Sequence, residues 1–271
     1  MIDIGVAGIG GRMGRAIASL VLDSRQMRLS GASESPGHSF IGRDAGECLG
    51  EGHLGIAICS DPAEAFAGCK VICDFTMPAS TMRNMEYASD AHKAMVIGTT
   101  GLSDEQKGII GKQAMTTPVV MAPNMSIGVN VMLKTAAMLT RMLGEDYDVE
   151  IVETHHRHKK DAPSGTAGAL AEAIAEARGV KLDDYACYER HGIIGERPHG
   201  QIGVQSLRAG DVVGDHTIMF ADKGERIELT HRAHSRENFA GGAIKAALWL
   251  AERQPGLYSM MDVLGLTDED R

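Results

Sequence analysis

The sequence predicts an α/β protein with a doubly wound parallel sheet and a second α+β domain built on an open mixed sheet. Three observations predict this. Short apolar runs alternate with helical patterns over about the first 120 residues, glycines crowd the first strand-to-helix turn, and several strands follow one another after residue 200. Buried strands that alternate with helices form parallel sheets through right-handed crossovers, whereas consecutive strands favour a mixed or antiparallel sheet.

Hydrophobic periodicity defines the elements of the first domain. The expected strands are the apolar runs 2–8, 28–33, 70–76, 94–100 and 118–122. The expected helices are the intervening stretches 11–22, 78–91 and 103–115. The glycine-rich segment 36–55 is weakly patterned, and we expect a loop there that holds at most one short strand.

The pattern changes after Asn124, which marks a boundary without a flexible linker. A long helix is expected over 127–143, and the alternation that begins at Tyr147 predicts a strand running into residues 155–158. Ser164 and Gly179 are expected to cap the two ends of the next helix, 165–178. The remaining expected elements are strands at 201–208, 215–221 and 225–232 and a helix at 237–252.

Charge and composition exclude several classes of function. The formal net charge is -9, from 27 Lys+Arg against 36 Asp+Glu, which is unfavourable for binding nucleic acid or an anionic membrane. No apolar stretch approaches the roughly 18 residues of a transmembrane helix, and the N-terminus does not look like a signal peptide. The five cysteines are odd in number and form no CxxC pair, as expected of reduced thiols. We therefore expect a cytoplasmic protein with neither a nucleic-acid nor a membrane partner.

The first strand-to-helix turn is the first candidate site. Its glycines follow the spacing Gly8-x-x-Gly11-x-x-Gly14, with Gly10 in addition, whereas the strict GxGxxG pattern would need glycine where Met13 stands. Such a Rossmann-like turn brings the backbone close to a pyrophosphate and aims a helix N-terminus at it. The alternative is a glycine-rich turn that binds nothing.

Three further segments are expected to line the same crevice. Glu34 lies 20 residues after Gly14 at the end of the second strand, where a carboxylate accepts hydrogen bonds from the adenosine ribose and repels a 2′-phosphate. The loops 98–101 and 122–125 follow later strands, and ligands of open α/β sheets collect at that edge. Either loop is also compatible with a plain turn, and Glu34 with a solvated loop.

The segment 155–160 holds three histidines and three fixed cations within six residues of an acidic chain. A helix that opens at Gly165 follows it, so cations and free N–H groups together form a receptor for a carboxylate or phosphate. A histidine there supplies a proton near neutral pH. On a strand, His155 and His156 point to opposite faces and have different roles. A zinc site and a solvated basic turn are the alternatives, although the histidine spacing is unusual for zinc.

From these residues the chain resembles the 4-hydroxy-tetrahydrodipicolinate reductase (dihydrodipicolinate reductase) family of lysine and diaminopimelate biosynthesis. The resemblance covers nearly the whole chain. It is carried most specifically by ExHHRHKxDAPSGTA at 153–167. The other matching motifs are GIGGRMG at 8–14, GTTG at 98–101, APNMSIGVN at 122–130, LRAGDVVGDHTI at 207–218 and THRAHSRENFAGGAIKAALWL at 230–250.

The resemblance implies reduction of a cyclic dicarboxylate, 4-hydroxy-tetrahydrodipicolinate, to tetrahydrodipicolinate with loss of water, by hydride from NADH or NADPH. It implies a dinucleotide-binding domain of residues 1–125 with 237–271. It also implies a substrate-binding and oligomerisation domain of residues 126–236, in a homotetramer. Arg236 is expected to brace the hinge between them.

The resemblance also implies residue roles. His155 is the acid/base and Lys159 the proton donor, while His156, Gly165 and Thr166 bind substrate. The implied cofactor contacts are Gly8, Ile9, Gly10, Gly11, Arg12, Met13, Glu34, Gly98, Thr99, Thr100, Ala122, Pro123, Asn124 and Met125.

In one respect the chain departs from the family pattern. Many members have arginine after the strand-end acid, where this chain has Ser35 and then Pro36. We therefore expect NADH to be preferred over NADPH, unless Arg12 or Arg43 binds the 2′-phosphate. Three other functions stay open from sequence: a dehydrogenase acting on a different small acid, a metallohydrolase that uses the histidines, and a non-catalytic dinucleotide sensor.

Overall fold

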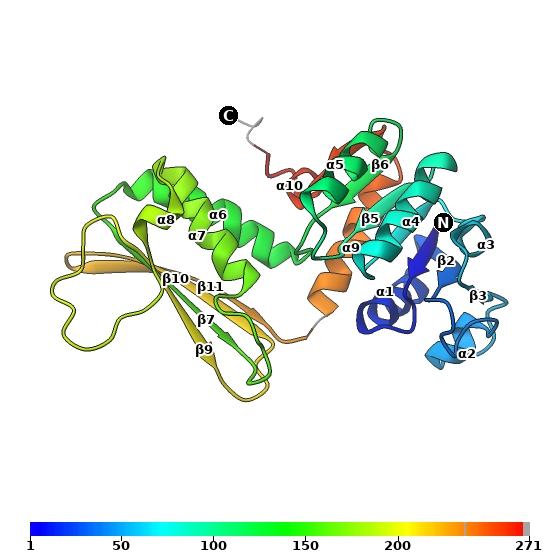
Figure 1. Cartoon of the computed structure of the whole chain (residues 1–271), viewed down its shortest axis with the longest axis horizontal. Coiled ribbons are helices and arrows are strands. Elements are labelled where there is room, and N and C mark those ends of the chain that lie inside the picture. Colours follow the sequence, from blue (N-terminus) through cyan, green and yellow to red (C-terminus); the bar gives the residue numbers. More distant parts are fainter. Residues whose placement is uncertain (236, 268–271) are drawn as a thin grey trace. The chain divides into compact units, whose positions relative to one another are not determined.

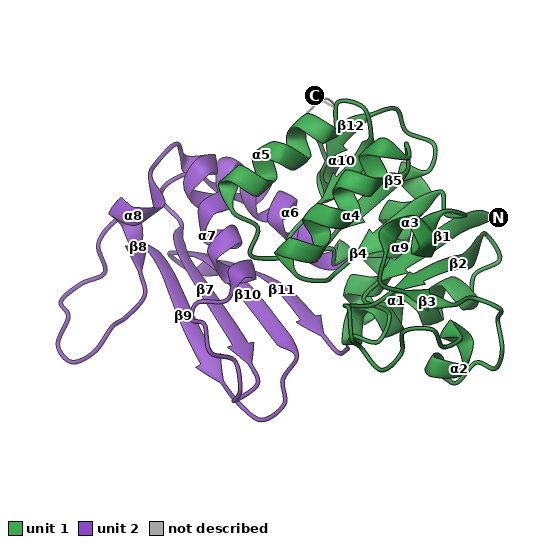
Figure 2. Ribbon diagram, turned by 45° about the vertical axis from the view of Figure 1, so that its right-hand side comes forward, with its two compact units in different colours: residues 1–127, 236–271 green, residues 128–235 purple. Residues whose placement is uncertain are grey.

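A computed structural model describes residues 1–235 and 237–267 (Figure 1). Arg236, for which a bracing role is expected, lies outside the described residues. The chain divides into two compact units (Figure 2). Unit 1 comprises Met1–Ile127 and Arg236–Arg271, and unit 2 comprises Gly128–Ser235.

Unit 1 is built on a seven-stranded sheet in the order β12-β6-β5-β4-β1-β2-β3, and all its pairings are parallel. This confirms the predicted fold class for the first domain. The five predicted strands are present, while the very short strands β3 and β12 escaped prediction because two or three residues carry no readable periodicity. The strands are β1 (Ile2–Ala7), β2 (Met27–Ser33), β3 (Ile58–Cys59), β4 (Val71–Asp74), β5 (Ala94–Ile97), β6 (Pro118–Met121) and β12 (Gly256–Tyr258).

Helices connect these strands, and one helix, α9, follows unit 2 in the sequence but belongs to unit 1. Helix α9 packs against α1 and against β4, β5 and β6, with Ala240, Ala243, Ala246 and Ala247 fully buried. Small side chains let the helix lie close to the sheet. The helices of unit 1 are α1 (Arg12–Leu22), α2 (Ala45–Leu49), α3 (Pro62–Phe66), α4 (Pro78–Asp90), α5 (Asp104–Gln113), α9 (Glu237–Leu250) and α10 (Met260–Leu264).

The segment 36–55, where we expect a loop with at most one short strand, contains a short helix, α2, and none of its residues, all of which are described, forms a strand. Asp44 explains the order of this glycine-rich stretch. Its carboxylate caps α2 by accepting from the N–H groups of Gly46 and Glu47 and also accepts from those of Leu54 and Ile56. One acid therefore replaces the apolar pattern that would otherwise organise the loop.

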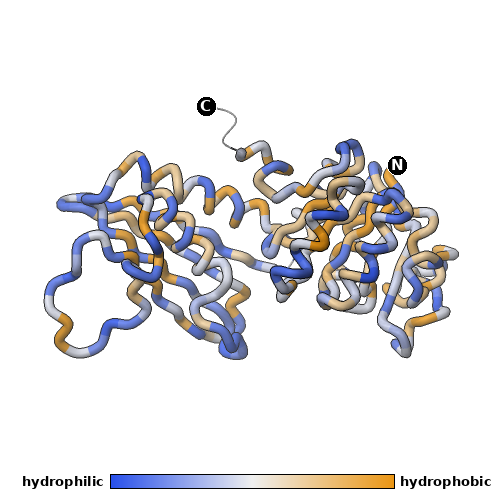
Figure 3. The backbone as a smooth tube through the Cα atoms, turned by 45° about the horizontal axis from the view of Figure 1, so that its top comes forward, coloured by the Kyte–Doolittle hydropathy of each residue, from blue (hydrophilic) through white to orange (hydrophobic). Residues whose placement is uncertain are grey.

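The sheet of unit 1 is apolar on both faces, as expected of a parallel sheet covered by helices. One core contains Ile4, Val6 and Val96, and the other contains Ile72 and Met95. Figure 3 shows hydrophobic segments gathered along the inner strands and helices, and mostly hydrophilic residues along the long loop 188–201.

Unit 2 is built on a five-stranded sheet in the order β11-β10-β7-β9-β8. Strand β7 pairs parallel with β9 and antiparallel with β10, so the sheet is mixed, as predicted. One face packs on α6 and α7 through Val149, Ile151 and Ile218. The strands are β7 (Asp148–His155), β8 (Ala186–Cys187), β9 (Ile202–Arg208), β10 (Gly214–Asp222) and β11 (Glu225–Ala233), and the helices are α6 (Ile127–Leu143), α7 (Gly165–Arg178) and α8 (Leu182–Tyr185).

The predicted caps of α7 are confirmed. The Ser164 hydroxyl accepts a hydrogen bond from the N–H of Ala167, and Gly179 ends the helix with φ 70°, in the left-handed region that favours glycine. The start of α7 is therefore determined locally by sequence. Within the described residues, no helix is both long enough and apolar enough to span a membrane.

Candidate active site

The glycine turn after β1 forms a tight cradle at the carboxyl edge of the parallel sheet. Gly8 has φ 68°, and its carbonyl accepts a hydrogen bond from Gly11 N–H. A Cβ on Gly14 would lie 2.1 Å from the Gly8 oxygen, so α1 approaches the turn at a distance that excludes a side chain. This close packing of the helix on the turn is what the third glycine of a dinucleotide-binding turn allows.

Glu34 is held directly against this turn. Its Oε1 accepts a hydrogen bond of 2.7 Å from Gly10 N–H, and its Oε2 accepts one of 3.1 Å from Ser35 N–H. A Cβ on Gly10 would lie 2.9 Å from Glu34 Oε1. The predicted glycine turn and the predicted acid thus form one arrangement, in which the carboxylate has a fixed orientation.

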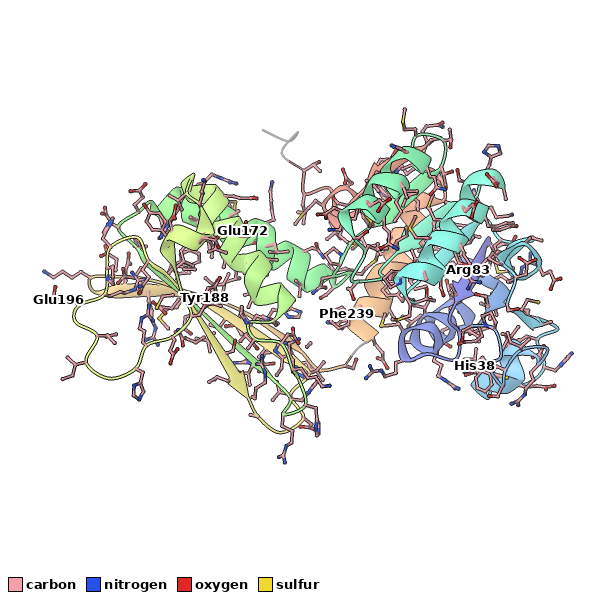
Figure 4. The ribbon with its side chains drawn as sticks, viewed as in Figure 1. His38, Arg83, Glu172, Tyr188, Glu196 and Phe239 are labelled. Atoms are coloured by element: carbon pink, nitrogen blue, oxygen red, sulfur yellow. The ribbon has the colours of Figure 1, made fainter. Side chains whose placement is uncertain are left out.

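A cavity of about 370 Å³ opens beside the turn within unit 1. It brings together Gly8, Gly10, Gly11 and Glu34, four of the residues expected to contact cofactor. Sequence reasoning missed the other wall, which is formed by Ser60 after the short β3, by the turn between β4 and α4, and by α4, because none of these segments carries a recognisable motif. Figure 4 labels two of the residues that line it, His38 and Arg83. The other lining residues are Ser33, Ser35, Ser60, Phe75, Thr76, Met77, Ser80 and Asn84.

The remaining expected cofactor residues do not line this cavity. Ile9, Ala122 and Met125 have buried side chains that belong to the core of unit 1, so their backbones are what they can offer a ligand. Arg12 is exposed at the first position of α1. The others that lie outside the cavity lining are Met13, Gly98, Thr99, Thr100, Pro123 and Asn124.

A buried carboxylate that sequence reasoning also missed organises the loops at this edge. Asp74, fully buried at the end of β4, accepts hydrogen bonds from the N–H and hydroxyl of Thr76 and from the hydroxyls of Thr81 and Thr99. Its second oxygen accepts from Asn84 Nδ2 at 2.7 Å. Thr99 belongs to the predicted 98–101 loop, so Asp74 joins that loop to α4. An acid ending an apolar strand could have indicated this.

In unit 2, the predicted acid/base histidine is backed by a buried glutamate. Glu153 Oε2 lies 2.5 Å from His155 Nδ1, and Arg208 donates to both Glu153 oxygens at 2.9 and 3.0 Å. Burial by itself would raise the pKa of the Glu153 carboxyl. The hydrogen bonds from Arg208, His155 and Ser206 outweigh that effect and hold the pKa at about 2. Glu153 is therefore ionised at neutral pH.

A second chain of hydrogen bonds leads to the start of α7. His216, on β10 opposite Glu153, contacts the Ser164 hydroxyl through Nε2 at 3.0 Å, and Ser164 N–H donates to Glu153 Oε1. Burial, together with the nearby His155, lowers the pKa of His216 to about 4, so this ring is neutral at neutral pH. Gly165 and Thr166 occupy the first turn of α7, where N–H groups point out of the helix end.

The basic segment leaves the sheet as a turn directly after β7. The Lys159 side chain forms an ion pair of 2.8 Å with Asp161, and the backbone N–H of Lys159 donates to the His156 carbonyl. Because β7 ends at His155, the expected opposite orientation of His155 and His156 on one strand does not apply. His156 Nδ1 is buried without a hydrogen-bond partner within the described part of the chain. Across the described residues, no group of three or more His, Cys, Asp or Glu could hold a metal ion.

Comparison with known proteins agrees with both units. The family model "Dihydrodipicolinate reductase, N-terminus" matches residues 2–125, and "Dihydrodipicolinate reductase, C-terminus" matches residues 128–264. The chain belongs to the dihydrodipicolinate reductase family. It is thus a nicotinamide-dependent reductase of diaminopimelate and lysine biosynthesis, which confirms the family and the class of reaction expected from the sequence.

Full-length relatives share this assignment. The chain is 53% identical over 260 residues to the 4-hydroxy-tetrahydrodipicolinate reductase of Syntrophus aciditrophicus (strain SB), covering 96% of this chain and 97% of the relative. It is 51% identical over 266 residues to that of Hahella chejuensis (strain KCTC 2396), covering 98% and 100%.

A solved structure, the dipicolinate-bound dihydrodipicolinate reductase from Paenisporosarcina sp. TG-14, superposes with a TM-score of 0.77. It has 25% identity over 97% of this chain and 98% of that one. An amine dehydrogenase from Mycobacterium smegmatis, 11% identical over 96% of this chain and 95% of that one with a TM-score of 0.60, shares the fold alone.

Proposed function

We propose that this chain reduces 4-hydroxy-tetrahydrodipicolinate to tetrahydrodipicolinate, with loss of water, through the groups gathered at the end of β7 in unit 2. The observation that carries the proposal is the set of His155 backed by ionised Glu153, the cation Lys159 and the N-terminus of α7. The substrate has two carboxylates and must gain a proton, and this set supplies positive charge, N–H donors and a proton. The solved relative that holds dipicolinate, a planar dicarboxylate, supports the same substrate class.

Each residue has a proposed role. His155 acts as the acid/base, because Glu153 occupies its Nδ1 and leaves Nε2 for the substrate. Lys159 donates a proton and attracts a carboxylate. The N–H groups of Gly165 and Thr166 bind a substrate carboxylate at the positive end of the α7 dipole, and His156 contributes a further substrate contact.

The cavity of unit 1 suits a nicotinamide dinucleotide, which supplies hydride when bound. The fit rests on the turn at Gly8, Gly10 and Gly14, where an added Cβ would collide with the backbone or with neighbouring side chains, and on the fixed Glu34 carboxylate. The proposed contacts beyond this cavity are the backbone of Ile9, Arg12, Met13, Gly98, Thr99, Thr100, Ala122, Pro123, Asn124 and Met125.

NADH is the proposed preferred cofactor. Both Glu34 oxygens face the glycine turn and Ser35, and a 2′-phosphate beside that carboxylate would be repelled. Ser35 and Pro36 carry no charge, and Arg43 lies 5.4 Å over the Phe40 ring. Arg83 is a fixed cation lining the cavity from α4. Comparing kcat/KM for the two cofactors tests the preference, and a higher value with NADPH would contradict it.

The domain roles and the assembly are part of the same proposal. Residues 1–125 with 237–271 bind the cofactor, and residues 126–236 bind substrate and form a cytoplasmic homotetramer. The adjacent, exposed Ile193 and Ile194 support assembly, because apolar side chains in water favour protein contacts. Sedimentation measurements would reveal the mass of four chains, and a monomer at working concentration would contradict this assembly.

Oxidation of NADH, measured while the substrate is formed from pyruvate and aspartate semialdehyde, tests the reaction. His155→Ala and Lys159→Ala are expected to lower kcat by about 10²–10⁴-fold, the contribution typical of a positioned acid or base. Lys181→Ala is a matched control, because this exposed lysine precedes α8 in the same unit. Unchanged turnover in both site variants would refute the proposed roles, and retention of activity after chelation would argue against a metal-dependent reaction.

A further inference from the structure

Glu153 contacts both the proposed acid/base histidine and the residue that caps the helix proposed to bind a substrate carboxylate. Its Oε2 lies against His155 Nδ1, and its Oε1 accepts from Ser164 N–H, the residue that caps α7. Its side chain is fully buried, and Arg208 contacts both oxygens. One carboxylate therefore spans the acid/base histidine and the helix end that is proposed to bind a carboxylate.

The sheet determines this position. Strand β7 lies between β9 and β10, which places Ser206 and His216 directly beside Glu153 on the neighbouring strands. His155 lies next along the same face, and its ring meets that of His216 edge-on at 5.2 Å. A Cβ on Gly214 would come within 3.0 Å of His155 Nε2, so glycine at that position leaves room for the ring.

We propose that Glu153 is a positioning residue that sets the orientation of the His155 ring and of the first turn of α7 relative to each other. His155 Nδ1 stays protonated and donates its hydrogen bond to the Glu153 carboxylate, and Nε2 is the nitrogen that exchanges a proton with substrate. When the imidazolium gives up its Nε2 proton, it becomes the neutral Nδ1–H form and the Nδ1 hydrogen bond is retained. The proposal rests on the function proposed above for His155 and α7.

Several groups face His155 from the elements packed around it. They are Glu153 on its own strand, Arg208 on β9, the neutral His216 on β10, and the Lys159–Asp161 pair in the turn that follows. Glu153 is the anion in direct contact with the ring, at Nδ1. Removing that charge changes the electrostatic environment of the ring, so we expect the pH profile of kcat/KM to change with it.

Glu153→Gln is the direct test. The amide has one acceptor oxygen where the carboxylate has two, so it cannot satisfy His155, Ser164 and both Arg208 donors together. We expect kcat to fall by roughly 10- to 100-fold, as for a small misplacement of reacting groups, with NADH affinity unchanged. We also expect KM for the dicarboxylate to rise, the pH profile of kcat/KM to change, and the His155 Nδ1–H resonance to change in ¹⁵N-histidine spectra.

Glu150→Gln is the matched control for loss of a paired carboxylate. Glu150 lies on the same strand with opposite side-chain parity, and Arg190 contacts both of its oxygens at 2.7 Å. This variant loses a similar ion pair, and we expect its pH profile and kcat to stay as in the wild type. If Glu150→Gln reproduced the loss of kcat and the changed pH profile, the proposal would be overturned.

The double variant Glu153→Gln, Arg208→Met separates positioning from folding, because it leaves no unpaired arginine in the sheet. We expect stability to recover and kcat to stay low. Recovery of kcat in the double variant, or a kcat within twofold of wild type in Glu153→Gln, would overturn the proposal. If His155→Ala itself left kcat unchanged, the proposed function would fail instead. If His155→Ala lost kcat while Glu153→Gln kept the wild-type kcat, only the positioning role of Glu153 would be refuted.

Discussion

Gly14→Ala is expected to weaken both the stability of unit 1 and its affinity for NADH. The new Cβ would lie 2.1 Å from the Gly8 oxygen and 2.8 Å from Gly8 C and Ile9 Cα. These are backbone atoms that cannot rotate away, and the Gly8 oxygen is already bonded to Gly11 N–H. Reaching even a 3.0 Å contact requires α1 and the turn to separate by about 0.9 Å, the difference between 3.0 and 2.1 Å.

The magnitude follows from two opposing effects. Overpacking of this kind costs about 1–3 kcal/mol, while alanine in place of glycine favours a helix by up to about 1 kcal/mol. The net loss of about 1–2 kcal/mol lowers Tm by roughly 2–8 °C for a domain of this size. Because the turn is also the proposed pyrophosphate cradle, NADH Kd should rise about tenfold or more, equivalent to about 1.4 kcal/mol.

Thermal melts and NADH fluorescence titrations measure both effects. Gly108→Ala is the matched control, because Gly108 lies inside α5 and its added Cβ would meet nothing within 4 Å. That variant should gain about 0.5–1 kcal/mol of stability and bind NADH normally. If Gly14→Ala were as stable as Gly108→Ala and bound NADH as tightly as wild type, the close approach of α1 to the turn would have no effect on stability or binding, contrary to this prediction.

Three further predictions concern buried polar groups. Asp74→Asn should lower the free energy of unfolding by about 1–3 kcal/mol and weaken NADH binding, because its amide N–H groups would face either Asn84 or the threonine hydroxyls. Thermal melts and NADH titrations measure the two effects, and normal NADH binding would contradict the prediction. Burial lowers the pKa of His216 to about 4 from its usual 6.5. As pH falls through 6.5, the ring therefore gains a proton in the unfolded chain before it does so in the folded chain. About 3 kcal/mol of folding stability is lost as pH falls from 6.5 to 4. Urea denaturation across that range should reveal the loss in wild type and a flatter profile in His216→Gln. Ser164→Ala removes the N-cap of α7, which should lower the free energy of unfolding by about 1 kcal/mol and raise KM for the dicarboxylate. A rise in KM for NADH alone would contradict the proposed role of the α7 N-terminus in binding substrate.

Local patterns in the chain were sufficient for much of the fold. The apolar runs of β1, β4 and β5 and the caps Ser164 and Gly179 were predictable because each depends on near neighbours in sequence. The short strands β3 and β12 and the order around Asp44 were not. Their stability comes from pairing with distant strands or from a single carboxylate, neither of which leaves a periodic pattern.

The sequence by itself determined the parallel α/β class, the glycine turn with Glu34, and the histidine-rich motif beside a helix start. These features are contiguous or regularly spaced, so elementary turn, cap and charge rules apply to them. Only the tertiary structure decided which groups support them. Glu153, Arg208 and His216 come from three strands, and Asp74 joins loops far apart in the chain. Buried polar groups need hydrogen-bond partners, and the strand register determines which residues lie beside them. The register of distant strands cannot be read from local sequence patterns.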